Sequence, residues 1–190
     1  MLNRHEDQDW IGHLTLMRKE KDEWMRGSPN SPLPLEKRHH FKGLGYFPPD
    51  AEYRLPANLH AYPEPRKLAM STSKGEGREY LRYGYFEFEV EGSKQTLQAY
   101  RSVKSRENPH EDEGLFIPFR DLTSGNESYG AARYLDLEYN PSGEYILDFN
   151  LAYNPNCAYS DNYICPFPPP ENWLKIPIRA GEKNFHRRGL

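Results

Sequence analysis

The spacing of apolar residues changes near residue 46, and this change limits the folds open to the chain. Between residues 7 and 25 apolar side chains recur every three or four positions, which predicts an amphipathic helix that ends near Gly27. The stripe runs along Trp10, Ile11, Leu14, Met17, Lys21, Trp24 and Met25. From residue 46 onward apolar residues recur at every second position, the spacing of a strand with one buried face.

The alternating region predicts an antiparallel sheet. Alternating runs at 52–59, 67–71, 78–90 and 96–103 are separated by turn-like segments at 74–77 and 91–93. A polar loop at 108–114 precedes residues 115–121, whose almost continuous apolar character favours a strand covered on both faces. Pro118 within that strand favours a bulge or an edge position.

The expected fold is mainly β: a curved antiparallel sheet, closed or half-closed into a barrel or sandwich, with one or two N-terminal helices packed outside. The second, short helix is predicted from Pro34 to Phe41, because proline at the first helical position loses no hydrogen bond. We expect one structural domain, with a helical segment at 1–45 and an antiparallel β region at 46–190. The 14 tyrosines, 9 phenylalanines and 3 tryptophans supply its core, although only 36% of residues are hydrophobic.

Charge and hydropathy argue against several classes of partner. The net charge is −3 and the basic residues form no cluster, so nucleic-acid binding is not expected. No apolar run is long enough for a membrane span or a signal peptide, which predicts a soluble, cytoplasmic protein without a membrane partner. In that compartment Cys157 and Cys165 are expected as buried free thiols.

Residues 133–150 contain the strongest pairing signal in the sequence. The segments 133–139 and 144–150 flank the turn-like NPSG at 140–143, where Gly143 can adopt the left-handed conformation, and they are predicted to form a hairpin. In the register set by this turn, Asp136 lies directly opposite Asp148 on one face. The other face is apolar and carries Leu135, Leu137, Leu147 and Phe149.

Two carboxylates directly opposite each other must be solvated, share a proton or be neutralised by a cation. Arg120 is the expected counter-charge, because Arg133 shares the parity of Leu135 and therefore points to the apolar face. The polar face is either the solvated side of a half-buried sheet or the wall of a pocket. The flanking loops at 121–130 and 150–154 are rich in hydroxyl, amide and carboxylate groups, which favours the pocket.

Three functions stay open. The first is a binding protein for a small polar molecule, whose expected ligand-binding residues are Arg120, Asp121, Tyr129, Arg133, Tyr134, Asn150, Tyr153, Asn154 and Glu182. The second is a hydrolase or isomerase in which Asp136 and Asp148 act as acid and base. The third is a protein-interaction module, or a homodimer, that uses the N-terminal helix. No metal and no other cofactor is expected, because the two cysteines lack the usual spacing of metal ligands.

The chain also resembles a known family. The resemblance is carried by LFIPFRDLTSG (115–125), RYLD (133–136), LDFN (147–150), AYNPNCAY (152–159), CP (165–166), PPEN (169–172) and AGEK (180–183), and upstream by KD (21–22), SPL (31–33) and FKGLGYFP (41–48). These segments are similar to the uncharacterised prokaryotic family called domain of unknown function 1684. The resemblance implies a prokaryotic source and a single domain, and it supplies no catalytic residue or cofactor.

Overall fold

The computed structural model describes residues 4–103 and 114–185, with side chains from residue 8 onward. Within these ranges the chain forms one α-helix, α1 (Arg4–Gly27), and the strands β1 (Arg54–Ser71), β2 (Gly77–Val90), β3 (Ser93–Ser102), β4 (Leu115–Phe119), β5 (Arg133–Leu137) and β6 (Glu144–Asp148). The second expected helix is a short 3-10 helix, Leu35–His40. The expected loop at 108–114 lies outside the described residues except for its last residue.

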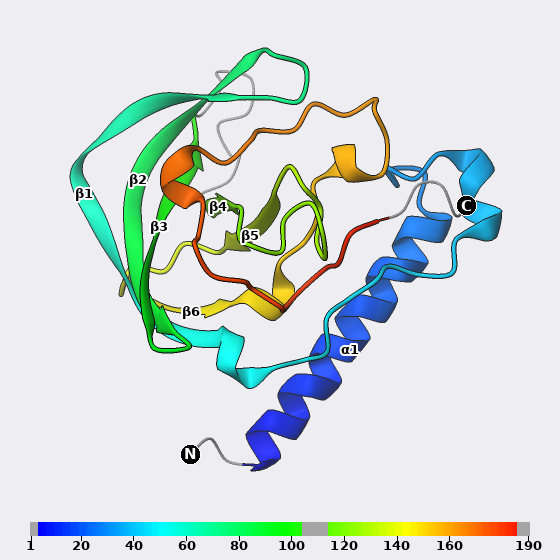
Figure 1. Cartoon of the computed structure of the whole chain (residues 1–190), viewed down its shortest axis with the longest axis horizontal. Helices are drawn as coiled ribbons and strands as arrows, with labels where there is room; N and C mark the ends of the chain where they lie inside the picture. Colours follow the sequence, from blue (N-terminus) through cyan, green and yellow to red (C-terminus); the bar gives the residue numbers. More distant parts are fainter. Residues whose placement is uncertain (1–3, 104–113, 186–190) are drawn as a thin grey trace.

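All six strands belong to one antiparallel sheet in the order β5-β4-β3-β2-β1-β6. The sheet curls into a half-barrel, with β1, β2 and β3 as its long wall and α1 outside it (Figure 1). The alternating runs predicted at 52–59 and 67–71 fall on one strand, β1, except that residues 52 and 53 belong to the 3-10 helix Ala51–Tyr53. The pairing of β1 with β2 shifts between Ala61 and Arg66. The predicted fold class is therefore confirmed, in its half-closed form.

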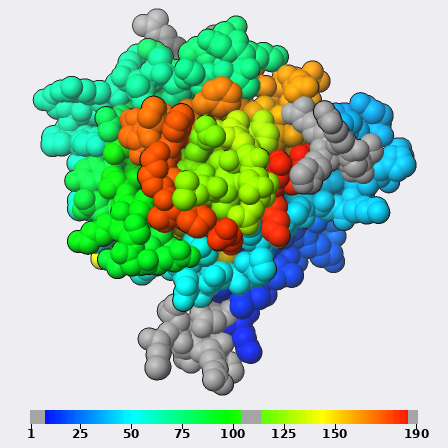
Figure 2. Space-filling view, viewed as in Figure 1, coloured from blue at the N-terminus to red at the C-terminus, as the bar shows by residue number. Residues whose placement is uncertain are grey.

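One face of the sheet packs around a core of aromatic and aliphatic side chains. Phe86 and Phe88 of β2, Ile117 of β4 and Phe149 after β6 belong to this cluster, and alternation turns them all to the same side. The C-terminal segment contributes buried residues to the same core, Leu174, Ile178 and Ala180. On the face seen in Figure 2 this segment (orange to red) frames the loop after β4 (light green).

Pro118 creates a gap in the pairing of β4. β3 and β4 share only the pair Tyr100 and Phe116, since proline cannot donate a ladder hydrogen bond. The Asn172 side chain fills the gap: its Nδ2 donates to the carbonyls of Pro118 at 2.8 Å and Gln98 at 2.9 Å, and its Oδ1 accepts from the Gln98 N–H at 2.8 Å. The expected edge or bulge is thus a local break inside the sheet.

The helix α1 docks on the β region through one face, as expected. Leu14 and Met25 are 1% and 0% exposed, and Arg18 on the same face donates to the Phe47 carbonyl at 3.0 Å. Met17 and Trp24, which belong to the predicted stripe, are 40% and 42% exposed. The docked face therefore includes polar contacts that a purely apolar stripe does not indicate. Among the described residues, no helix combines the length and the apolar composition needed to cross a membrane.

The predicted hairpin between 133–139 and 144–150 is wrong. Residues 140–143 do form a turn, in which Gly143 has a φ of 74° and its N–H donates to the Asn140 carbonyl at 3.1 Å. The two strands then diverge, because β5 pairs with β4 and β6 pairs with β1 at opposite edges of the sheet. Leu135 and Leu147 still face one core, so the alternation is satisfied without pairing between β5 and β6.

Candidate functional site

Asp136 and Asp148 lie on strands at opposite edges of the sheet. Asp136 of β5 pairs with Phe116 of β4, and Asp148 of β6 pairs with Arg54 of β1. The predicted carboxylate pair is therefore absent. Asp136 and Asp148 do not face each other, so they cannot act as the acid and base of one site. The reason is that each strand takes its hydrogen-bonding partner from a distant part of the sequence rather than across the turn.

Asp148 is buried against the N-terminal half of α1. Its Oδ2 accepts a hydrogen bond from Trp10 Nε1 at 2.8 Å and lies 3.7 Å from Arg54 Nε. Its Oδ1 accepts from the backbone N–H and the side-chain Nδ2 of Asn150, both at 2.9 Å. Asn150 in turn donates to the Asp50 carbonyl at 2.8 Å. These contacts hold α1 and the segment before β1 on the sheet, so Asp148 and Asn150 have structural roles.

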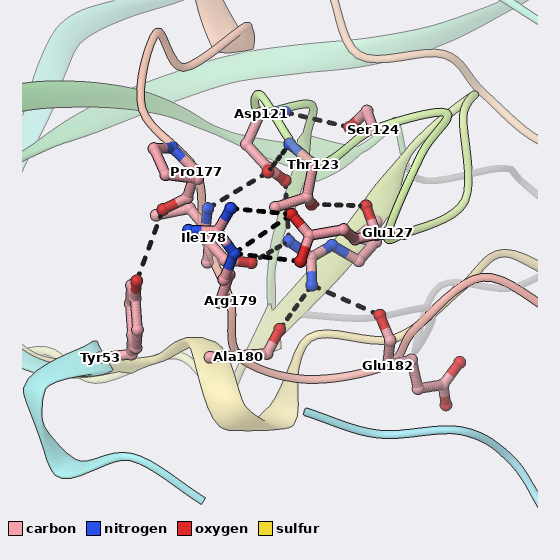
Figure 3. Close-up of polar contacts among 12 residues, drawn as sticks. Tyr53, Asp121, Thr123, Ser124, Glu127, Pro177, Ile178, Arg179, Ala180 and Glu182 are labelled. Atoms are coloured by element: carbon pink, nitrogen blue, oxygen red, sulfur yellow. Dashed lines mark hydrogen bonds and ion pairs between the residues drawn. The ribbon is translucent and has the colours of Figure 1, made fainter. Parts of the chain in front are cut away.

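Arg133 and Asp121 form a buried ion pair with Nη2 to Oδ2 at 2.7 Å and both side chains 0% exposed. Arg133 also donates to the carbonyls of Ile178 at 2.7 Å and of Ala180. Asp121 accepts from the N–H groups of Thr123 at 2.7 Å and Ile178 at 3.2 Å (Figure 3). The pair holds the C-terminal segment against the half-barrel. Arg133 points to the core face, as its parity predicted, and neither side chain can be reached from solvent.

The remaining predicted polar residues are distributed over two other places. Arg120 lies over Trp173, with 4.9 Å from its guanidinium carbon to the ring centroid, so it packs the C-terminal segment and has no acidic pair to neutralise. Tyr129 packs against the buried cluster around Met25, and its hydroxyl lies 3.7 Å from Cys157 Sγ. Cys157 and Cys165 are buried free thiols, as expected, and the Cys157 N–H donates to Cys165 Sγ at 3.2 Å.

Glu182 is the centre of a buried polar network. Its Oε1 accepts from Lys21 Nζ of α1 at 2.5 Å, and its Oε2 accepts from Tyr159 Oη at 2.6 Å and the Asn154 N–H at 2.9 Å. Burial and the charge of Glu182 raise the pKa of Tyr159, so its phenol is a donor at neutral pH. Glu182 is 1% exposed. Its partner Lys21 was placed on the helical stripe by the sequence, but the contact between them was not predicted.

Tyr134, Asp136 and Tyr153 form a further group of predicted site residues that the structure brings together, and this group lies beside a groove. Tyr134 and Tyr153 form an isolated antiparallel bridge, and the Tyr153 hydroxyl donates to Asp136. Tyr134 and Asp136 lie on the face of β5 turned away from Leu135 and the core. Next to them a groove of about 760 Å³ opens over β2 to β5, lined by aromatic rings and carboxylates, chiefly Tyr80, Phe116, Asp136, Glu138, Tyr139 and Tyr153.

A row of contacting aromatic side chains runs from this groove to a smaller pocket beside it, which Tyr134 lines. The ring of Phe116 stacks on Tyr80 with centroids 5.3 Å apart and meets Tyr134 edge to face at 4.7 Å. Tyr134 in turn meets Tyr153 edge to face at 5.7 Å. This second pocket, of about 230 Å³, shares Tyr80, Phe116 and Tyr153 with the groove. Burial raises the pKa of Tyr80, Tyr134 and Tyr153, so all three rings are neutral phenols at physiological pH.

Sequence reasoning missed Tyr80 and Phe116 as groove residues. The alternation of β4 places Phe116 on the face opposite the core. Tyr80 has the same parity as the core residues Phe86 and Phe88 of β2, and it lies on the opposite face because the register of β2 shifts between Arg82 and Gly84. Neither pattern indicates that these strands come beside Asp136. That neighbourhood depends on the strand order, and the hairpin predicted at 133–150 implied a different order. Among the residues that the structure describes, no group of three His, Cys, Asp or Glu side chains could hold a metal ion.

Comparisons with known proteins agree with the resemblance found in the sequence. A solution NMR structure of an uncharacterised protein from Haloarcula marismortui is 39% identical, covers 95% of this chain and 97% of its own, and superposes with a TM-score of 0.72. No curated protein matches the chain. The family profile described as "Protein of unknown function (DUF1684)" matches residues 39–183. The chain therefore belongs to the DUF1684 family.

Proposed function

We propose that the chain binds a small polar molecule in the groove over β2 to β5. The observation that carries the proposal is the composition of this groove, whose lining combines aromatic rings with the carboxyl groups of Asp136 and Glu138. Its volume of about 760 Å³ lies in the usual range of small-molecule sites. Apolar rings with a few polar groups are the combination by which such sites bind and orient their ligands.

The groove also has a rigid supporting shell, which favours binding over a simple solvated surface. The Tyr134 hydroxyl donates to the Pro166 carbonyl at 2.6 Å, and the Tyr153 hydroxyl donates to Asp136. Phe116 is held between the rings of Tyr80 and Tyr134. Side chains fixed in this way lose little conformational entropy when a ligand arrives, so more of the contact energy appears as affinity.

Chemical-shift mapping on ¹⁵N-labelled protein tests the proposal. The probes are choline, methyl β-glucoside, adenosine and benzoate, which represent a cation, a neutral sugar, a nucleoside and an anion. We expect at least one of them to shift resonances of Phe116, Asp136 and Tyr153 in a saturable way. The proposal is overturned when all four leave these resonances unchanged, or shift only residues of another surface such as Tyr62 and Arg66.

A variant and a matched control locate the effect. Tyr139→Ala removes a groove ring that is 44% exposed, and Trp24→Ala removes an equally exposed ring, at 42%, from α1. Binding should weaken in Tyr139→Ala and stay at the parental level in Trp24→Ala. Equal weakening in both variants would contradict a groove site.

A further inference from the structure

We infer that a bulge between β1 and β2 forms a second binding site, for a small organic oxyanion: a carboxylate or a phosphate attached to an aromatic or aliphatic body. This site is separate from the groove, because the two sets of lining residues have no member in common. Three features support it: an irregular stretch of β1 that opens a pocket, two arginines in directly opposite positions, and an anchor that fixes one of them beside an aromatic ring.

The pocket is opened by the segment YPEP at 62–65 of β1, on the long wall of the half-barrel (Figure 1). Two of its four residues are prolines, which cannot donate ladder hydrogen bonds. The regular pairing stops at Ala61 and resumes at Arg66, so the four residues between them stand against one residue of β2, Tyr83. Bulges of this kind frequently occur next to active sites. The resulting pocket has a volume of about 470 Å³, in the usual range of small-molecule sites, and is lined by Tyr62, Pro63, Glu64, Arg66 and Arg82.

Two arginines of the pocket lie in directly opposite positions of the sheet. Arg66 of β1 pairs with Arg82 of β2, so both side chains leave the sheet on the same face. Like charges in such positions destabilise a sheet unless they are neutralised. Arg66 is exposed, and no hydrogen bond or ion pair joins it to another residue that the structure describes. Its guanidinium group therefore has its N–H donors available for a ligand.

Arg82 is held in a fixed orientation beside Tyr62. Its Nε donates to Gln98 Oε1 at 3.0 Å, and the Tyr62 hydroxyl donates to the same oxygen at 2.8 Å. The guanidinium carbon lies 5.6 Å from the centroid of the Tyr62 ring. Gln98 is itself buried, and its backbone N–H and carbonyl are both hydrogen-bonded to the Asn172 side chain. A guanidinium group and a ring that are positioned in this way lose little conformational entropy when a ligand binds.

The pocket recognises its ligand by oriented donors rather than by a large net charge. Arg82 Nη2 lies 3.8 Å from Glu171 Oε1, which is longer than a hydrogen bond, so this carboxylate offsets part of the charge without taking the donor. Glu64 adds a second carboxylate to the surroundings of the two arginines. The forked N–H groups of a guanidinium match the paired oxygens of a carboxylate or phosphate, and such charge-assisted hydrogen bonds are the strong ones.

The rest of the lining determines the body of the ligand. The Tyr62 ring and Pro63 present apolar surface beside the two arginines. An aromatic or aliphatic group attached to the oxyanion can pack on this surface while its oxygens reach the guanidinium groups. A bare inorganic anion lacks this second contact.

Chemical-shift titration with benzoate, phenyl phosphate and benzamide tests the inference. Benzamide has nearly the shape of benzoate but lacks its charge and its second oxygen. The ¹⁵N resonances of the backbone and of the arginine Nε–H groups report binding at Arg66 and Arg82. We expect the better of the two anions to bind about tenfold more tightly than benzamide, since hydrogen bonds to an ionised acceptor are roughly twice as strong as neutral ones. The comparison of benzoate with phenyl phosphate identifies the preferred oxyanion.

Arg66→Gln and a matched control, Lys67→Gln, supply the second arm. Lys67 is the next residue of β1, so its side chain leaves the opposite face of the strand, and its ion pair with Glu79 at 3.2 Å is exposed. Both variants remove one positive charge from the same strand, but only Arg66 lines the pocket. Affinity for the better anion should fall about tenfold in Arg66→Gln and stay at the parental level in Lys67→Gln. Thermal melting verifies that both variants are folded.

The inference is overturned when neither anion binds more tightly than benzamide, or when the anions leave the resonances of Tyr62, Arg66 and Arg82 unchanged. Parental affinity in Arg66→Gln would place the anion elsewhere, and an equal loss in both variants would mean that only the general charge of the strand matters. The groove is judged by other resonances, those of Phe116, Asp136 and Tyr153. Failure at this pocket therefore leaves the proposed function standing, and failure at the groove leaves this site standing.

Discussion

Arg133 of β5 and Asp121 of the loop after β4 form an ion pair at 2.7 Å from which solvent is fully excluded. Arg133 is also hydrogen-bonded to three backbone carbonyls of the C-terminal segment, those of Ile178, Ala180 and Glu182. The ion pair thus holds the C-terminal segment against the half-barrel. Such an arrangement is stable only while both partners are present, because a lone buried charge is costly.

We predict that Arg133→Met lowers the free energy of unfolding by about 3–5 kcal/mol, since it leaves Asp121 buried without a counter-charge. Urea denaturation at neutral pH measures the loss. Arg179→Met is the matched control: it also breaks an arginine–carboxylate pair, with Glu127 at 3.0 Å, but that pair is exposed and should matter far less. Equal losses would mean that the buried pair has no special role. If Arg133→Met fails to fold, Asp121→Asn, which keeps the shape of the side chain, provides the same comparison.

We predict that Gly181→Ala is strongly destabilising. Gly181 has a φ of 77°, and a Cβ at this position would lie 2.5 Å from the Ala152 carbonyl oxygen, which is part of the backbone and cannot move aside. The left-handed conformation alone costs an alanine about 1–2 kcal/mol, and the overlap adds to it, for a total above about 3 kcal/mol. Gly75→Ala, with a φ of 83° and no atom within 4 Å, should show only the first contribution. Similar thermal melting of both variants would refute the steric argument.

We predict that the pKa of Glu127 rises in Arg179→Met. The hydrogen bonds from Arg179, at 3.0 and 3.1 Å, hold the pKa of this carboxyl below its ordinary value in the native protein. A group with a lowered native pKa contributes stability above its unfolded pKa, and this contribution disappears as the pH falls through the native pKa. A ¹³C NMR titration of the Glu127 carboxyl measures the change. An unchanged titration midpoint in the variant would show that Arg179 is not the cause.

We predict that Cys157 and Cys165 react slowly with iodoacetamide in the native protein and both react after unfolding in urea without reductant. A hydrogen bond to Cys157 and burial raise the pKa of Cys165, so it is a protonated thiol at neutral pH, and only the thiolate reacts quickly. Both side chains are also inaccessible, at 5% and 6% exposure. Mass spectrometry counts the modified groups. A count of zero in the unfolded protein would mean that the two cysteines form a disulfide.

The sequence determined most of the local structure. The change of apolar period placed α1 and the long strands, and the glycine-containing segments at 74–77 and 91–93 placed their turns. Alternation also assigned faces correctly in the region whose pairing was misjudged, since Leu135 and Leu147 point into the core and Arg133 lies on their side. These properties depend on neighbours in the chain and on burial, which a single sequence contains.

Only the tertiary structure decided which strands are neighbours, and with them the site. The turn at 140–143 is compatible both with a hairpin and with two strands that diverge, because turn chemistry fixes the bend but not the partner beyond it. Pairing with β4 and β1 buries the same leucines and builds the six-stranded half-barrel, whose two edges are β5 and β6. That choice separated Asp136 from Asp148 and placed Asp136 beside Phe116. The partners of a buried face are set by long-range packing, and alternation along one strand carries no information about them.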